Sequence, residues 1–160
     1  MCRSPTEALQ ATTDLLARTG AVVVKQAHNG AGVGNQLVTA DAGLASGHVG
    51  ARHLHHLGDT GGAAVAAYWA QRWDWASAGG RYPVVVEEFT DHTASVYSEH
   101  YANEAGTYPT QTGLLCYVGR RLSHQIVPLP EVDDAVRVQL VDGGTRLAQL
   151  YRAVGHRAGT

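Results

Sequence analysis

One lysine lies directly before a loop in which glycine alternates with other residues. Lysine and arginine total 12, and Lys25 is the only lysine, so the other eleven are arginines. The chain continues QAHNGAGVGN, which places glycines at Gly30, Gly32 and Gly34. Because glycine has no side chain, its backbone N–H groups can approach an anion closely, and an ammonium beside them adds a compact positive charge. These residue types in this order predict a binding site for phosphate groups.

Two common glycine-rich phosphate loops do not match this stretch. A P-loop carries its lysine after the glycines, whereas Lys25 precedes them. A dinucleotide-binding fingerprint reads GxGxxG and opens a helix, but residues 30–34 read GxGxG and Gln36–Thr39 is typical of a strand. A β-hairpin with the glycines at its tip, closing as a mobile lid over phosphates, matches better. A plain glycine turn beside a solvated lysine is the structural alternative.

Local signals predict the elements that must position this loop. Ser4 has the character of a helix cap, Pro5 of a first helical residue, and Glu7 of a capping-box partner. Gly20 predicts the end of the same helix. The β-branched run 21–24 then predicts a strand buried on both faces. The lysine therefore follows a helix and a buried strand.

The later segments mix helix and strand signals. Trp69 and Trp73 lie on one stripe of a predicted helix over residues 63–78, and their spacing favours packing over stacking on bases. Residues 82–86 predict another buried strand, which leads into Glu87 and Glu88. The rest predicts antiparallel strands at 94–102, 113–118 and 122–127, a segment of ambiguous period at 132–141 and a helix at 145–154.

Four histidines gather in GHVGARHLHHL: His48, His53, His55 and His56. Imidazole is a common metal ligand, but no cysteine or carboxylate stands at a matching spacing. The segment is rich in glycine and alanine and has no clear period, so we predict a solvated loop. A histidine-rich metal binder is the weakest functional alternative.

The composition excludes several classes of protein. A formal charge of −2 argues against a surface built for nucleic acid, and the short apolar runs predict no membrane span. Cys2 and Cys116 are too few and too far apart for a disulfide framework or a metal motif, which favours a reducing, cytoplasmic location. We therefore expect a globular protein.

The stretch VVVEEF, which ends at Phe89, is followed by SEHYANEAG at residues 98–106, and the two together resemble the ATP-grasp superfamily. In that superfamily a strand ends in lysine, a glycine-rich loop follows, and a helix leads to a strand with an acidic hinge. The chain is most similar to peptide ligases of the pheganomycin type, whose loop also carries a histidine and a Gly-Asn ending, here His28 and Gly34-Asn35. Residues 119–130, GRRLSHQIVPLP, also resemble theirs, and the resemblance runs from about residue 8 to the C-terminus.

This resemblance implies an α+β, ATP-grasp-like fold of two small lobes with mostly antiparallel sheets and flanking helices. Residues 1–86 would form the N-terminal lobe with its lid, and residues 87–160 the C-terminal lobe, starting at the hinge. The bound cofactor would be ATP. Its contacts would be Lys25, His28, Gly30, Gly32, Gly34 and Asn35 around the phosphates, Glu87, Glu88, Phe89 and Thr90 along the adenine, and Asp91 at the ribose.

The chemistry implied is that of a carboxylate–amine ligase acting on amino acids or peptides. ATP phosphorylates a carboxylate, an amine attacks the acyl phosphate, and Mg²⁺ neutralises the transferred phosphoryl group. The superfamily carries its metal ligands on strands after a helix that resembles residues 150–157, and this chain stops at Thr160. We therefore expect the last strands to be missing and the chain to be a fragment or split piece.

A sheet without its last strands has an exposed edge, so a partner chain or self-association is expected to complete it. The acidic residues Glu131, Asp133 and Asp134 precede the helix and are not assigned as metal ligands, and no catalytic residue is identified. The main alternative is a non-catalytic nucleotide-binding or interaction module of the same fold.

Overall fold

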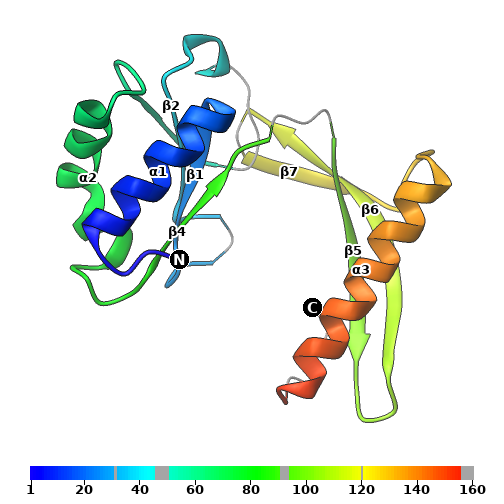
Figure 1. Ribbon diagram of the computed structural model, residues 1–160. Coiled ribbons are helices and arrows are strands. Elements are labelled where there is room, and N and C mark those ends of the chain that lie inside the picture. The colour runs from blue at the N-terminus through cyan, green and yellow to red at the C-terminus, as the bar shows by residue number, and fades with distance from the viewer. Residues whose placement is uncertain (31, 46–50, 91–93, 120, 156–160) are drawn as a thin grey trace. The chain divides into compact units, whose positions relative to one another are not determined.

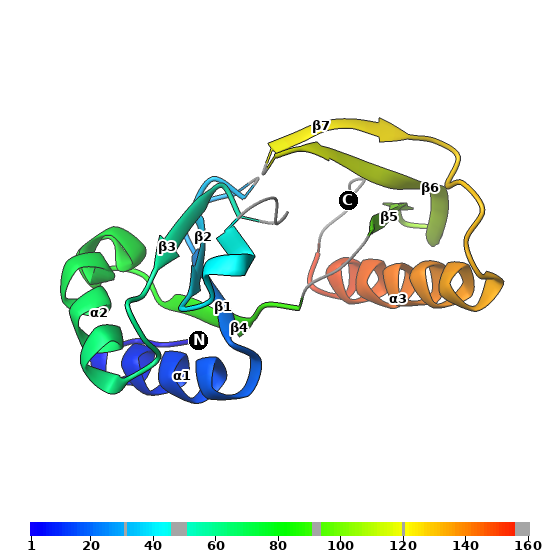
Figure 2. The same ribbon diagram turned by 90° about the horizontal axis from the view of Figure 1, so that it is seen from above.

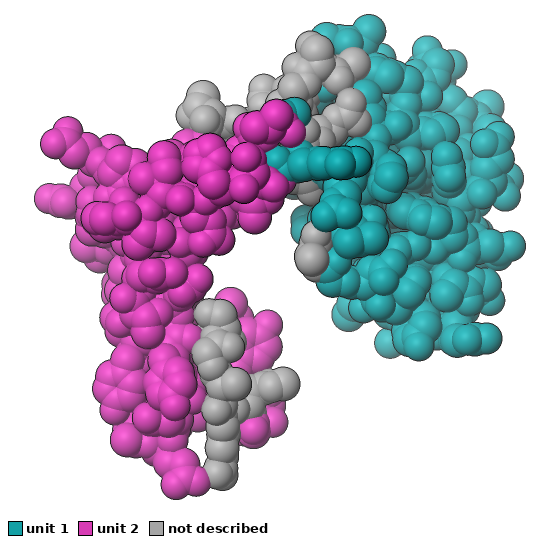
Figure 3. All heavy atoms as spheres, turned by 180° about the vertical axis from the view of Figure 1, so that it is seen from behind, with its two compact units in different colours: residues 1–91, 119–121 teal, residues 92–118, 122–160 magenta. Residues whose placement is uncertain are grey.

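The computed structural model describes residues 1–30, 32–45, 51–90, 94–119 and 121–155 (Figure 1). The chain forms two compact units, each with a sheet of its own. Unit 1 comprises residues 1–91 and 119–121, and unit 2 comprises residues 92–118 and 122–160 (Figure 3). The predicted α+β class, with mostly antiparallel sheets and flanking helices, is confirmed.

Unit 1 contains a four-stranded sheet in the order β3-β2-β1-β4. Strand β1 pairs antiparallel with both β2 and β4, whereas β3 runs parallel to β2. The central position explains why the run 21–24 is apolar throughout, since it is buried on both faces of the sheet. The bounds are Ala21–Gln26 for β1, Asn35–Thr39 for β2, His53–His56 for β3 and Val84–Glu88 for β4.

The first helix, α1 (Pro5–Thr19), begins and ends where the sequence predicts. The backbone N–H of Glu7 donates to the Ser4 hydroxyl at 3.2 Å, which satisfies one of the first N–H groups of the helix. At the other end Gly20 has φ of 74°, and its N–H donates to the carbonyl of Leu16 at 2.9 Å. These caps fix the point where the chain enters β1.

Helices α1 and α2 (Gly62–Ser77) cover one face of this sheet (Figures 1 and 2). Trp69 is the largest fully buried side chain of the interface, and its indole N–H donates to the Thr12 hydroxyl at 3.0 Å. The helix stripe predicted from the tryptophan spacing is therefore a packing stripe. Its neighbours in the core include Leu16, Val22, Val24, Val38, Val65 and Val84.

The opposite face of the sheet has a smaller apolar cluster. It contains Val23, Leu37 and Phe89, with Leu44 of the short 3-10 helix η1 (Ala42–Ala45) packed against them. Because side chains alternate along a strand, Lys25 projects to this same face as Val23. Lys25 therefore lies on the face away from α1 and α2.

The predicted histidine loop is wrong for residues 53–56, which form strand β3. Leu54 pairs with Leu37 of β2, so a parallel partner distant in the sequence organises the segment. The His55 ring is tilted against the Tyr68 ring of α2, with centroids 4.8 Å apart, while His56 alternates to the other face. His48 lies outside the described residues. No group of three or more metal-ligating side chains occurs among the residues described.

The pKa of His55 is lowered by burial, with further repulsion from Arg72 and His56. The neutral ring is thus favoured in the fold, so its contribution to stability is present above the ordinary pKa of 6.5 and lost as pH falls below it. We expect the melting temperature of unit 1 to fall between about pH 7 and pH 5. His55→Asn should reduce this fall. The exposed His53 offers the control, and His53→Asn should retain the wild-type slope; equal slopes for the two variants would contradict the assignment.

The described residues of unit 2 form a three-stranded sheet in the order β5-β6-β7 and the helix α3. Strands β5 and β6 form an antiparallel hairpin, and its turn is closed by Asn103, whose side-chain oxygen accepts from the N–H groups of Ala105 and Gly106. Strand β6 begins earlier than the predicted residue 113. The bounds are Ser95–Ala102 for β5, Thr107–Val118 for β6 and Arg121–Ile126 for β7.

A continuous 20-residue helix, α3 (Asp134–Ala153), occupies the segment whose period was ambiguous. Its Gly144 is needed for packing, because a Cβ there would lie 2.6 Å from the Ser98 hydroxyl oxygen of β5. Asp133 is the N-cap of this helix, and its carboxylate accepts from the N–H of Ala135 at 2.7 Å. Neither α3 nor any other helix in the described ranges has the length and apolarity to cross a membrane.

Candidate phosphate-binding site

Lys25 lies at the base of the predicted β-hairpin. It pairs with Asn35 across β1 and β2, and the N–H of Gln26 donates to the carbonyl of Gly34 at 3.1 Å. The described residues 27–30 and 32–34 therefore lie between the two strands. The hairpin predicted from the glycine pattern is present, with the lysine where its first strand approaches the loop.

The three glycines of the loop have different structural roles. Gly32 has φ of 70°, a conformation that other residues adopt at a cost. A Cβ at Gly34 would lie 2.8 Å from the Cβ of Gln26, so only glycine allows this close approach. A Cβ at Gly30 would have no neighbour within 4 Å. The loop thus leaves backbone exposed at Gly30 and requires glycine at the other two positions.

Lys25 forms an ion pair with Glu87 of β4. Lys25 is opposite Val85 in the β1–β4 register, and Glu87 comes two residues later on β4, so both side chains project to the same face. The side chains are 37% and 45% exposed, respectively. The ammonium is therefore accessible to a dissolved anion, and its present partner is a carboxylate.

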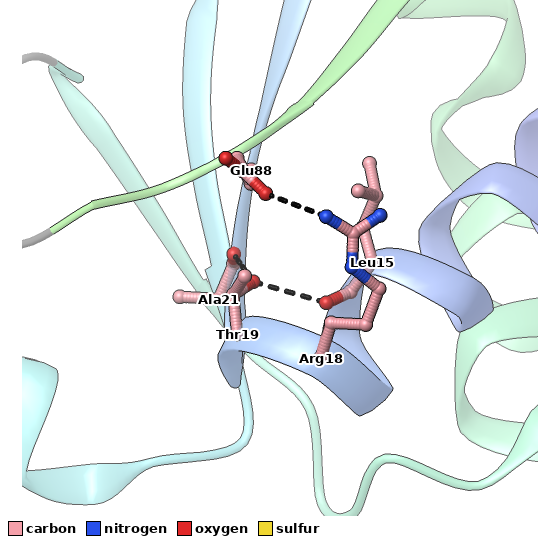
Figure 4. A network of polar contacts seen from close by, with 5 residues as sticks. All are labelled: Leu15, Arg18, Thr19, Ala21 and Glu88. Carbon is pink, nitrogen blue, oxygen red and sulfur yellow. Dashed lines mark hydrogen bonds and ion pairs between the residues drawn. The ribbon is translucent and has the colours of Figure 1, made fainter.

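Glu88 projects to the opposite face and has a different partner. Its carboxylate lies 3.1 Å from the Arg18 guanidinium of α1 (Figure 4). In the same network the Thr19 hydroxyl lies 3.0 Å from the Leu15 carbonyl and 2.8 Å from that of Ala21. Exposed ion pairs of this kind contribute at most about 1 kcal/mol to stability. The structure thus separates two adjacent glutamates that the sequence grouped together.

The residues after Glu88 differ in exposure. Phe89 is 9% exposed in the smaller apolar cluster, and its backbone N–H donates to the Ala21 carbonyl at 3.1 Å. Thr90 is exposed, and Asp91 lies outside the described residues. Of the predicted adenine-contacting segment, Glu87 is the residue that the structure brings next to Lys25.

Two side chains that the sequence did not single out support the hairpin. The Gln26 amide donates to the Trp75 carbonyl of α2 at 2.5 Å and accepts from the Asn29 amide. The ring of His28 stacks on Tyr82, with centroids 4.9 Å apart. Gln26 is a buried polar residue at a helix-facing position of an otherwise apolar strand. This polar residue among apolar ones is the sequence feature that could have indicated its role in the hairpin. Nothing in the pattern indicated Tyr82.

The donor set suits a phosphate better than a metal ion. An accessible ammonium and a bare glycine backbone both stabilise negative oxygens. A Mg²⁺ site needs several oxygen ligands together, and the described part of the chain holds no such group. Asp133 caps helix α3 through its hydrogen bond to the N–H of Ala135.

The fold of the chain, which the sequence predicted to be ATP-grasp-like, is similar to that of a solved protein. That protein is D-alanyl-alanine synthetase A from Vibrio cholerae O1 biovar eltor. The TM-score is 0.57 at 13% sequence identity, and the alignment covers 98% of this chain. The chain spans 40% of the length of that protein. No family model matches the sequence, and no curated protein matches it either.

Proposed function

We propose that unit 1 binds the phosphates of ATP between Lys25 and the glycine-rich hairpin. The observation that carries this proposal is the Lys25 ammonium, which lies at the hairpin base and faces Glu87 on one face of the sheet. The bare backbone at Gly30 and Gly32 supplies donors beside that charge. A triphosphate carries more negative oxygens than the Glu87 carboxylate, so it can displace that carboxylate from the ammonium.

The other predicted contacts belong to the same proposal. His28 and Asn35 stand at the two ends of the loop, next to where the phosphates would lie. Glu87, Glu88, Phe89 and Thr90 would follow the adenine, and Asp91 would contact the ribose. Because the Phe89 N–H already donates to Ala21, the adenine would need other backbone groups of this segment as partners.

The ATP-grasp-like fold supports a carboxylate–amine ligase, with amino acids or peptides as substrates and the pheganomycin type as the specific hypothesis. A substrate carboxylate oxygen would attack the γ-phosphorus, and the bond to the β,γ-bridging oxygen would break to release ADP. An amine would then attack the acyl carbon, forming an amide and releasing phosphate. Mg²⁺ would neutralise the phosphoryl oxygens when bound.

The assembly proposed is two lobes, residues 1–86 and 87–160, completed by a partner chain or by self-association, in the cytoplasm. Unit 2 has a three-stranded sheet, whose outer strands β5 and β7 offer edges for pairing. We propose that a partner chain or a second copy of this chain pairs there. A non-catalytic nucleotide-binding module with the same fold remains the alternative function.

Isothermal titration with ATP, with and without Mg²⁺, tests the proposal. We expect Lys25→Met to weaken ATP binding about tenfold to a hundredfold, because it removes a charged hydrogen-bond donor to phosphate. Arg18→Met is the matched control, since it removes a positive charge paired with a glutamate on the other face of the sheet. This control should leave the affinity unchanged.

An absence of ATP binding, or equal losses in the Lys25 and Arg18 variants, would contradict the proposed site. ADP release on adding amino acids or peptides would indicate a ligase. ATP binding without ADP release would instead favour the non-catalytic module.

A further inference from the structure

A cavity of about 410 Å³ lies between α1 and α2, within unit 1. Leu9 of α1 borders it on one side, and Ala66, Trp69, Ala70, Trp73 and Asp74 of α2 border it on the other. The volume is in the range of small-molecule sites, about 300–1,000 Å³. Both helices pack on the sheet face opposite Lys25, so this cavity is separate from the proposed phosphate site.

Alternating small and large residues of α2 create the cavity. Ala66 and Ala70 are four residues apart, as are Trp69 and Trp73, so two short side chains lie beside two long ones on the helix surface. The Trp69 ring is fixed by burial and by its hydrogen bond to Thr12. Trp73 meets it edge-on with centroids 6.1 Å apart. The aromatic walls are therefore held in place before any ligand arrives.

The charge at the rim is negative. Asp74 is the ionisable residue among those that line the cavity, and its carboxylate makes no hydrogen bond or ion pair with another described residue. It lies in the last turn of α2, where the helix dipole adds negative potential. Indole faces also attract cations. An apolar body with a positively charged head thus matches both the walls and the rim.

We propose that this cavity binds an organic ammonium ion, with its hydrocarbon body between the helices and its head at Asp74. The body would contact Leu9, Ala70 and the two indoles. The head would remain partly in water, because Asp74 is exposed. An anion or a doubly charged polar ligand has no matching partner among the lining residues that the structure describes.

Calorimetric titration with 4-phenylbutylammonium tests the proposal, and 4-phenyl-1-butanol serves as a neutral probe with the same body. The ammonium should bind about fivefold more tightly than the alcohol, since one exposed ion pair contributes modestly. Asp74→Asn should remove that difference and leave alcohol binding intact. Asp142→Asn, an equal charge change on exposed α3, should preserve it. The tryptophan fluorescence should change on binding, because two of the three tryptophans line the cavity.

Ala70→Leu gives a second, independent outcome. The position is exposed, so the variant is expected to fold, and the larger side chain fills the cavity. It should weaken the binding of both probes at least tenfold. Equal affinity of wild type for the two probes, or unchanged binding in Ala70→Leu, would overturn the proposal. These measurements contain no nucleotide, so their result is independent of the ATP site.

Discussion

Replacing Trp69 with alanine should lower the free energy of unfolding of unit 1 by about 3–5 kcal/mol. Trp69 is 2% exposed and lies between α1, α2 and the sheet, so its loss leaves a large cavity. Its indole N–H also donates to the Thr12 hydroxyl, which is itself buried. Removing the indole therefore leaves a buried hydroxyl without this partner, at a further cost.

Denaturant unfolding followed by tryptophan fluorescence measures this effect in unit 1 alone. All three tryptophans, Trp69, Trp73 and Trp75, belong to that unit, and two remain as probes in the variant. Trp69→Phe should cost less, because the ring is kept and only the hydrogen bond and part of the volume are lost. Tyr108→Ala, at an aromatic residue of unit 2 that is 47% exposed, is the control and should leave the unfolding of unit 1 unchanged. A Trp69→Ala variant as stable as this control would contradict the packing described.

Gly34→Ala should destabilise unit 1 by about 1–3 kcal/mol and also weaken ATP binding. The added methyl would lie 2.8 Å from the Cβ of Gln26 and 3.1 Å from that of Asn29. Gln26 cannot move freely, because its amide donates to the Trp75 carbonyl and accepts from Asn29. The backbone at the hairpin base, next to Lys25, would therefore have to shift.

The neighbouring Gly30 provides a matched control for this substitution. An added methyl there has no atom within 4 Å, and its φ is not positive, so Gly30→Ala should leave the melting temperature unchanged. Thermal unfolding measures the stability of both variants, and titration with ATP measures their affinity. If Gly34→Ala equals Gly30→Ala in stability, the close contact with Gln26 is not a constraint on the hairpin.

Features specified by a few neighbouring residues were predictable. Ser4, Pro5 and Glu7 set the start of α1 and Gly20 its end, because caps act on backbone groups within one turn. The hairpin of β1 and β2, with Lys25 at its base, follows from a strand, a glycine loop and a second strand in succession. These elements were predictable because the residues that specify them are close together in the sequence.

The helix α3 shows where such local information ends. Gly143 and Gly144 lower helix propensity, and the sequence predicted a helix only over residues 145–154, after a segment of ambiguous period. The structure has one continuous helix, because Gly144 allows close packing against Ser98 of β5. Strand β3 is a similar case, since its parallel partner β2 precedes it by more than a dozen residues.

The sequence by itself determined which residue types were available for phosphate binding: one lysine, a glycine loop and two adjacent glutamates. Only the tertiary structure decided which of the two glutamates pairs with the lysine. Strand alternation directs Glu87 toward Lys25 and Glu88 toward Arg18 of α1. The direction of each side chain depends on the register of β4 against β1, and that register is set by burial of Val84 against the helices. Long-range packing, which no local pattern encodes, thus selected the carboxylate beside the lysine.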